Sequence, residues 1–365
     1  MDWVPTIAAQ SANFPATTPD KPYLVRHRIQ ERPKISIRDS VSFGADWRFT
    51  PRDVLTFGFQ YAYFKAEFWV RQVSFDVGRV ASFGPDFTQG AAGTGFAQTV
   101  YDARQKDGTT YMPSLRWKHT GPTWQFQVNS AFSRASNHYR NFDKGYFQTN
   151  NAYFRNLTIR FEDMNFDHPG VISVKNAAGA DVDPYKIANY NLETVQGTKI
   201  DGFDIVRSLS ANAKRDFDLR LPLTMKTGFD LRSQRRDLGT STYDATHMGA
   251  DGLIRTADDN AAQWFDPVYS QRDLLFGKKM EWMNLAAIGD SYRANPAHFV
   301  QTETNRMNYY RSNVNGSKVI TETVTETATE TATETATVTA TETATETATE
   351  TATQTATETA TQTAT

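Results

Sequence analysis

Side chains of opposite character alternate along the segment 35–49, ISIRDSVSFGADWRF. The odd positions are apolar, with Asp39 as the exception, and the even positions are serine, arginine, glycine or aspartate. Because successive side chains of a β-strand point to opposite faces, this pattern predicts a two-faced strand. Its length of about 15 residues is far above the ~5–6 residues of an average strand.

The same period of two returns along much of the chain. It predicts further strands at 54–72, 111–118, 123–135, 152–164, 205–214 and 218–236, the one at 205–214 being weaker. Near Phe64 the apolar positions change parity, since Phe68 and Val70 continue the apolar face, and a β-bulge is expected there.

The connections between these segments alternate between short and long. Tight turns are expected at 50–53, 119–122 and 215–217, and long loops at 72–108, 165–202 and 236–313. Outer-membrane barrels have short turns on one side and long loops on the other, with strands of about 9–11 residues in the bilayer. The prediction is an all-β fold, a partial antiparallel transmembrane β-barrel of about 7–8 long strands.

Composition excludes several classes of function. The chain has no cysteine, which rules out disulfides, thiolate zinc sites and cysteine nucleophiles. Its six histidines are scattered, with none at HExxH spacing, and no catalytic signature is found, so we expect no enzyme. Setting aside the eight glutamates of 321–365, the chain total of −2 becomes +6 for residues 1–320, too diffuse to indicate a nucleic-acid partner. No signal peptide or apolar membrane helix is visible in the sequence.

Three stretches resemble mid-barrel strands of TonB-dependent outer-membrane receptors. They are RDSVSFGADWRFTPRDVLTFGFQYAYF (38–64), TYMPSLRWKHTGPTWQFQVNSAF (110–132) and LRLPLTMKTGFDLRSQRRDL (219–238). The segments NFDHPG (165–170) and GADGLIRTADDN (249–260) are similar to outer loops of that family. The resemblance covers roughly residues 23–324 and rests on strand texture and turn placement.

The resemblance implies active uptake of a scarce ligand such as a siderophore, cobalamin or a glycan. Its partners would be outer-membrane lipid, the transported small ligand and, for the full-length receptor only, an inner-membrane energising complex. The family's barrel has about 22 strands around a plug domain. Neither a plug, a TonB-contacting segment nor an aromatic terminal strand is recognisable here. We therefore expect an internal receptor fragment of the outer membrane, not functional alone.

A second interpretation retains the predicted strands but places them in a soluble protein. A soluble β-rich protein also has strands with one wet and one dry face, and it would recognise glycans or surfaces through its long loops. Expression without detergent separates the two, since the soluble protein would stay monomeric and the membrane fragment would aggregate.

The C-terminal segment is a low-complexity repeat. From Thr321 to Thr365 every odd position is threonine, and the even positions carry glutamate, alanine, valine or glutamine. The segment 317–324 reads as the strand that returns after the last long loop. We expect two regions, a partial barrel over 1–324 and a disordered Thr/Glu/Ala repeat over 325–365, because neither face of the repeat is apolar.

One loop carries a candidate metal site. Asp251, Asp258 and Asp259, with glycines between them, offer a calcium ion several oxygens in the 249–260 loop. Their order is not that of an EF-hand, and a solvated, turn-rich loop is the alternative. No other cofactor is expected. The nearby aromatic residues Trp264, Phe265, Tyr269, Trp282 and Tyr292 could stack on a ligand or pack the loop on itself.

Cations alternate along the predicted polar faces. Arg38, Arg48, Arg220, Lys226 and Arg232 lie there together with Asp46, Asp218 and Asp230. We expect them to form ion pairs in a wet interior. An anion path is the functional alternative.

Overall fold

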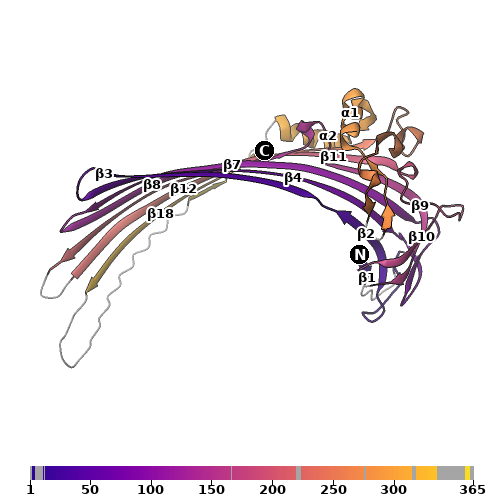
Figure 1. The fold of residues 1–365 in the computed structure, drawn as a ribbon, viewed down its shortest axis with the longest axis horizontal. Coiled ribbons are helices and arrows are strands. Elements are labelled where there is room, and N and C mark those ends of the chain that lie inside the picture. The colour runs from indigo at the N-terminus through magenta and orange to yellow at the C-terminus, as the bar shows by residue number, and fades with distance from the viewer. Residues whose placement is uncertain are drawn as a thin grey trace.

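The computed structural model describes residues 2–4, 11, 13–165, 167–218, 223–274, 277–314, 318–334 and 358–361. The protein is mostly β-strand, and its long strands form one antiparallel sheet that curves as a single layer (Figure 1). They are β2 (Tyr23–Glu31), β3 (Lys34–Arg48), β4 (Asp53–Asp76), β7 (Gly95–Thr120), β8 (Trp124–Arg140), β9 (Thr149–Met164), β11 (Asn191–Phe217), β12 (Leu223–His247) and β18 (Lys318–Glu334).

Shorter elements decorate the sheet. The short strands are β1 (Asp2–Val4), β5 (Val80–Gly84), β6 (Phe87–Gly90), β10 (Pro169–Lys175), β13 (Phe265–Asp266), β14 (Asp273–Leu274), β15 (Lys278–Lys279), β16 (Trp282–Met283), β17 (Phe299–Val300) and β19 (Glu358–Thr361). The α-helices are α1 (Leu285–Ala294) and α2 (Glu303–Val314). Single 3-10 turns are η1 (Phe142–Lys144), η2 (Ile187–Asn189), η3 (Ala257–Asp259), η4 (Ala261–Trp264), η5 (Tyr269–Gln271) and η7 (Pro296–His298). Among the described residues, no helix has the length and apolar character needed to cross a membrane.

The long strands follow one another as a meander. β2 and β3 pair with successive parts of one side of β4, so together they occupy one strand position. β8 and β9 share a position in the same way, between β7 and β11. The order is then β2/β3, β4, β7, β8/β9, β11, β12 and β18. This confirms the prediction of an all-β, antiparallel arrangement of long strands. Among the described residues β3 and β18 do not pair with each other, so the sheet is open.

The predicted alternation of connections is confirmed, with corrected bounds. The short connections are 49–52, 121–123 and 218–222, and the long ones are 77–94, 165–190 and 248–317. The loops are shorter than expected because the strands run further: β4 continues to Asp76, β7 begins at Gly95 and β11 begins at Asn191. Small and polar residues in these extensions hide the alternation that the prediction used.

The bulge predicted near Phe64 is wrong. β4 pairs with β7 in one unbroken register from Asp53 to Asp76, and with β3 without a shift from Val54 to Phe68. The change of parity has a different cause. Val73 and Phe75 are buried on the face that carries Leu55. Phe64 and Phe68 lie on the opposite face, against the guanidiniums of Arg38 and Arg104, so apolar residues are no longer confined to one face.

The repeat enters the sheet as β18. The predicted return strand is present, but it continues past the expected boundary at 324 to Glu334, pairing with β12 throughout. Residues 325–334, in the segment expected to be disordered, thus lie in this strand, and their disorder in solution stays a prediction. Threonine's β-branched side chain favours the extended backbone, and β12 offers a free edge to pair with. The expectation for 335–357 and 362–365 lies outside the described residues.

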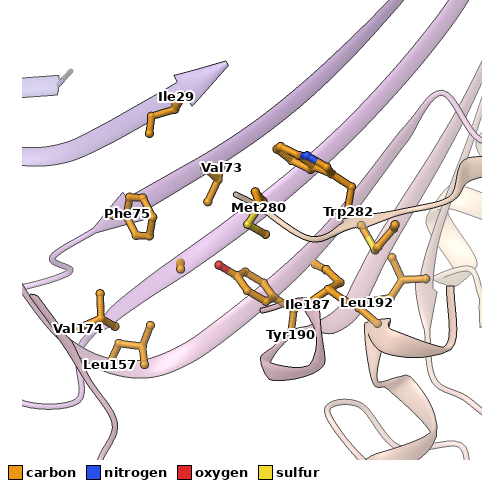
Figure 2. Packing of buried hydrophobic residues seen from close by; sticks show 14 of the residues in the cluster. Ile29, Val73, Phe75, Leu157, Val174, Ile187, Tyr190, Leu192, Met280 and Trp282 are labelled. Carbon is orange, nitrogen blue, oxygen red and sulfur yellow. The ribbon is translucent and has the colours of Figure 1, made fainter. Parts of the chain in front are cut away.

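The loop-bearing end of the sheet has a second layer. Residues 177–190 and the described parts of 248–300, here called the cap, pack on one face of that end (Figure 1). Side chains from β2, β4, β9 and β11 meet cap residues Ile187, Tyr190, Met280 and Trp282 there (Figure 2). All four cap side chains are almost completely buried, so the hydrophobic core lies between the cap and the sheet.

Candidate functional site: an uncovered apolar band beside a packed cap

Strand register assigns every wall residue to one of two faces, since directly opposed residues share a face. Trp47, Leu55 and Trp117 oppose one another across β3, β4 and β7. Trp117 in turn opposes Val128 of β8, which opposes Ala211 of β11. We call this the apolar face and its opposite the polar face.

The half of the apolar face near the short turns is uncovered. It carries a band of large apolar residues, here the apolar band: Val41, Phe43, Trp47, Leu55, Phe57, Phe59, Tyr61, Tyr111, Leu115, Trp117, Val128, Phe132, Leu209, Ala211, Phe229 and Leu231. Trp47 is 65%, Val41 62% and Phe43 58% exposed. A contiguous apolar patch of this kind on a single layer is typical of a surface that another apolar phase covers.

The apolar band has defined ends. On β7 it runs from Trp117 to Tyr111, with Trp47 at the turn side and Tyr61 at the cap side. Beyond the cap-side end the face becomes charged. Asp201 accepts from His138 Nδ1 at 2.6 Å and lies 3.2 Å from Lys199 Nζ. Aromatic rings therefore lie at both limits of the band on β3, β4 and β7, and charged groups follow at the cap side.

Arginines interrupt the apolar band on the later strands. Arg207 of β11 lies between Phe132 of β8 and Ser233 of β12, and it is exposed. Arg235 opposes Ile205 of β11 one row nearer the cap. The band therefore has no charged side chain on β3, β4 and β7, whereas arginines interrupt it on β11 and β12.

The cap covers the other half of the same face. Phe75 is fully buried, and its ring meets the Tyr185 ring edge-on at 5.8 Å. A second aromatic group joins the cap to β12 and to the segment between β8 and β9. Its members are Phe142, Phe147, Tyr243, Tyr292, Phe299 and Tyr309, with Phe142 and Tyr243 stacked at 4.9 Å. Such pairs add about 0.5–1.5 kcal/mol each beyond their buried area.

Buried ions tie the cap to the strands. The Arg71 guanidinium donates to Glu31 at 3.0 Å and lies 3.4 Å from the centroid of the Tyr269 ring. Elsewhere Arg155 of β9 and Arg255 of the cap both donate to Glu193, at 2.6 and 3.0 Å. Burial, the largest influence, raises the pKa of Glu193, but the two guanidiniums outweigh it and hold that pKa below its ordinary value.

A cleft of about 430 Å³ opens where the cap meets β4 and β7. Its walls combine aromatic rings with charged and amide groups: Glu67, Trp69, Tyr101, Gln105, Lys144, Tyr146, Asp266, Tyr269 and Asn284. Rings that can stack, beside a few polar groups, are the usual composition of a small-ligand site. It is a candidate ligand site at the edge of the cap.

The predicted calcium residues are used in other ways. The Asp258 carboxylate accepts from the backbone N–H of Ala250 at 2.6 Å and from the Thr256 hydroxyl, and these donors lower its pKa to about 2. Asp259 is fully buried and accepts from His247 Nδ1 at 2.8 Å, while Asp251 accepts from the backbone N–H of Leu253. Within the described ranges no group of three or more acidic or histidine side chains is arranged for a metal ion. The geometry gives the calcium hypothesis no support.

The aromatic residues of the long loop divide between two roles. Trp264 and Trp282 are buried in the core, and Tyr292 belongs to the aromatic group, so these three pack the loop on itself. Tyr269 lines the cleft, and Phe265 is 43% exposed. Trp69, Tyr101 and Tyr146 were not predicted as site residues, because nothing in β4, β7 or the segment 141–148 indicates which loop will cover them.

In the part of the chain that the structure describes, the ion pairs predicted on the polar faces are not formed. Among the described residues, Asp46, Asp218 and Asp230 make no ion pair with Arg38, Arg48, Lys226 or Arg232, and Arg220 lies outside the described residues. Arg38 instead lies over the Phe64 ring, 5.5 Å from its centroid. Other cations of this face are paired, Lys214 with Asp216 and Arg236 with Asp204, both at 2.9 Å.

Comparison with known proteins returned nothing: no family model, curated protein or solved structure matches this chain.

A buried histidine makes the cap region sensitive to acid. His27 of β2 is 3% exposed, its Nδ1 has no hydrogen-bond partner, and burial lowers its pKa to about 4. A histidine with a depressed folded pKa contributes full stability above its unfolded value of about 6.5 and loses it as pH falls towards 4. We expect a loss of about 3 kcal/mol between pH 7 and pH 4 from this group.

His27→Phe should remove the loss of stability between pH 7 and pH 4 that comes from this histidine. The measurement is the free energy of unfolding of both proteins at several pH values between 4 and 7. Because other groups titrate in both proteins, the difference between the two curves isolates His27. Parallel curves would contradict the assignment.

Proposed function

We propose that this chain is a membrane-embedded part of an outer-membrane transport barrel of the TonB-dependent receptor type, which takes up a scarce ligand. The observation that carries the proposal is the apolar band on a single-layered sheet. Soluble proteins cover such a face with a second layer, and here the second layer stops where the band begins.

The dimensions support a bilayer as the covering phase. On β7 the band runs from Trp117 to Tyr111, and the strand that carries it has 26 residues, more than the about 9–11 that a tilted strand needs to cross. All long connections lie at the cap end, as the outer loops of such a barrel do. The alternation of apolar and polar residues along the strands also resembles that of this family.

The open edge of β3 fits a place within a larger wall. β3 pairs with β4 on one side, and in the described part of the chain no strand covers its other side over 34–48. In lipid an unpaired edge is costly, because each unsatisfied backbone group costs several kcal/mol. In the proposed barrel a further strand pairs with β3.

Tryptophan quenching tests the bilayer placement. The chain is unfolded in urea and diluted into phosphatidylcholine vesicles whose acyl chains carry bromine, which quenches fluorescence on contact. We expect quenching from Trp47 and Trp117 in the band. Trp47→Phe/Trp117→Phe should abolish most of it, whereas the matched pair Trp264→Phe/Trp282→Phe, in the cap core, should leave it unchanged.

The soluble alternative predicts the opposite result. A soluble binding protein would remain monomeric without detergent or lipid, unfold cooperatively and show no bromine quenching. A genomic observation separates the receptor assignment from membrane embedding alone. A plug-domain coding segment directly upstream favours the receptor, and complete unrelated genes on both sides count against it.

A further inference from the structure

Cations and aromatic rings alternate across the polar face of four neighbouring strands. Arg38 of β3 and Lys106 of β7 both lie over the Phe64 ring of β4, at 5.5 and 5.9 Å from its centroid. Lys106 also lies 5.0 Å from the centroid of the Tyr139 ring of β8. Arg104 of β7 lies between Tyr139 and the Phe68 ring of β4, at 5.9 and 5.4 Å. We call these six residues the cation–aromatic ladder.

Register makes the ladder compact. Arg38 opposes Phe64, Lys106 opposes Tyr139, and Arg104 opposes Phe68, so the ladder fills three successive rows of one face. Lys34 of β3 also opposes Phe68, so it adds a fourth cation to this face. Residues two apart on a strand are about 7 Å apart, which sets the spacing between Arg104 and Lys106.

The positive charge of the ladder is not neutralised. In the described part of the chain no carboxylate lies within ion-pair distance of Arg38, Arg104 or Lys106. The facing acid is Asp102, two residues from Arg104 on the same face, and its Oδ1 is buried without a partner. Burial raises the pKa of Asp102. Arg104 Nε is likewise buried without a partner.

Ring contacts hold the cations without using up their hydrogen bonds. A guanidinium or ammonium over an aromatic face is attracted by the ring's quadrupole and keeps its N–H groups free. Guanidinium N–H groups match the paired oxygens of carboxylates and phosphates, and an ammonium binds the same groups as a point charge. The rings themselves can stack on a planar part of a ligand.

We propose that the cation–aromatic ladder binds a small solute that carries several anionic oxygen groups about 7 Å apart. In the proposed barrel the polar face is the interior, so a role of this site in uptake rests on the proposed function. Binding itself does not, and it is measurable on the chain in uncharged detergent or in plain buffer.

The probe is pyranine, a pyrene that carries three sulfonates, followed by its fluorescence anisotropy in dodecyl maltoside micelles. We expect saturable one-to-one binding that inorganic tripolyphosphate displaces and that weakens steeply as salt rises. Arg104→Gln/Lys106→Gln should weaken binding by at least tenfold. Phe64→Leu/Tyr139→Leu, which keeps every charge, should weaken it by at least threefold.

A matched control removes two charges from the same face where no ring accompanies them. Lys226→Gln/Arg232→Gln on β12 should leave the affinity within twofold of the parent chain. Circular dichroism of each variant shows whether it keeps the fold. Equal weakening by the β7 pair and the β12 pair would overturn the proposal in favour of attraction by net charge. Unchanged binding in all variants would also overturn it.

The same titration distinguishes the sources of anionic oxygens. Phosphatidylglycerol in mixed micelles is compared with tripolyphosphate at equal phosphate concentration. If the lipid displaces pyranine equally well, the ladder binds a lipid headgroup and the solute proposal is overturned. Failure of the bromine quenching with intact pyranine binding would reject the membrane placement and leave the binding site standing.

Discussion

Leu209→Arg is expected to cut insertion of the chain into lipid vesicles, with a cost of about 2–4 kcal/mol. Leu209 is 39% exposed in the apolar band, on β11 between Ser130 and Leu231. A guanidinium there would face the hydrocarbon, where no water solvates it. The measurement is the urea dependence of folding into phosphatidylcholine vesicles, followed by tryptophan fluorescence.

Two neighbours on the same strand serve as controls. Ser208→Arg places the same side chain on the polar face and should change insertion by less than about 1 kcal/mol, as surface substitutions generally do. Arg207→Leu should improve insertion, since it removes a charge already in the band. Equal losses for Leu209→Arg and Ser208→Arg would show that the two faces do not differ in their surroundings.

Phe75→Ala should lower the free energy of unfolding of the cap and its sheet by about 3–5 kcal/mol. Phe75 is fully buried in β4 and packs against Tyr185 and the core that contains Met280 and Trp282 (Figure 2). Cutting the ring to a methyl group leaves a cavity that the surrounding side chains fill only in part. Fluorescence of the buried Trp264 and Trp282 during denaturant unfolding reports the change.

Phe57→Ala is the matched control in the same strand. Phe57 lies on the same face of β4 as Phe75, but it is 40% exposed in the apolar band. Without lipid its truncation should cost less than about 1 kcal/mol, because little buried contact is lost. Similar losses for the two variants in detergent-free buffer would contradict the division of this face into a capped and an uncovered half.

Alternation in the sequence was enough to predict the strands where one face differs from the other. The prediction succeeded for 35–49 because no protein covers either side of β3, so each face keeps a distinct character. It failed in the extension of β4 beyond Gln72, where Val73, Ser74 and Phe75 are all buried and the contrast between the two faces is lost. An alternating pattern reveals a strand only where its two faces differ in polarity, and burial on both sides removes that difference.

Local signals were present for part of the long loop. Asn284 accepts a hydrogen bond from the backbone N–H of Ala287, so it caps α1, and an Asn before an alanine-rich stretch is a recognisable helix start. The cleft was out of reach for a different reason. Trp69, Tyr101 and Tyr269 come together only when the loop folds back on β4 and β7, and no sequence period encodes that contact.

The pairing of β18 with β12 has a consequence for the repeat's length. A TETA unit has four residues, which is twice the repeat of a strand's pleat, so gain or loss of whole units leaves threonine on the same face of β18. If β18 shifts along β12 by one four-residue unit, nearly every residue is replaced by an identical one. Along most of its length β18 therefore has many near-equivalent alignments with its neighbour, and only Lys318–Ile320 and Val324, which break the pattern, distinguish one alignment from the next.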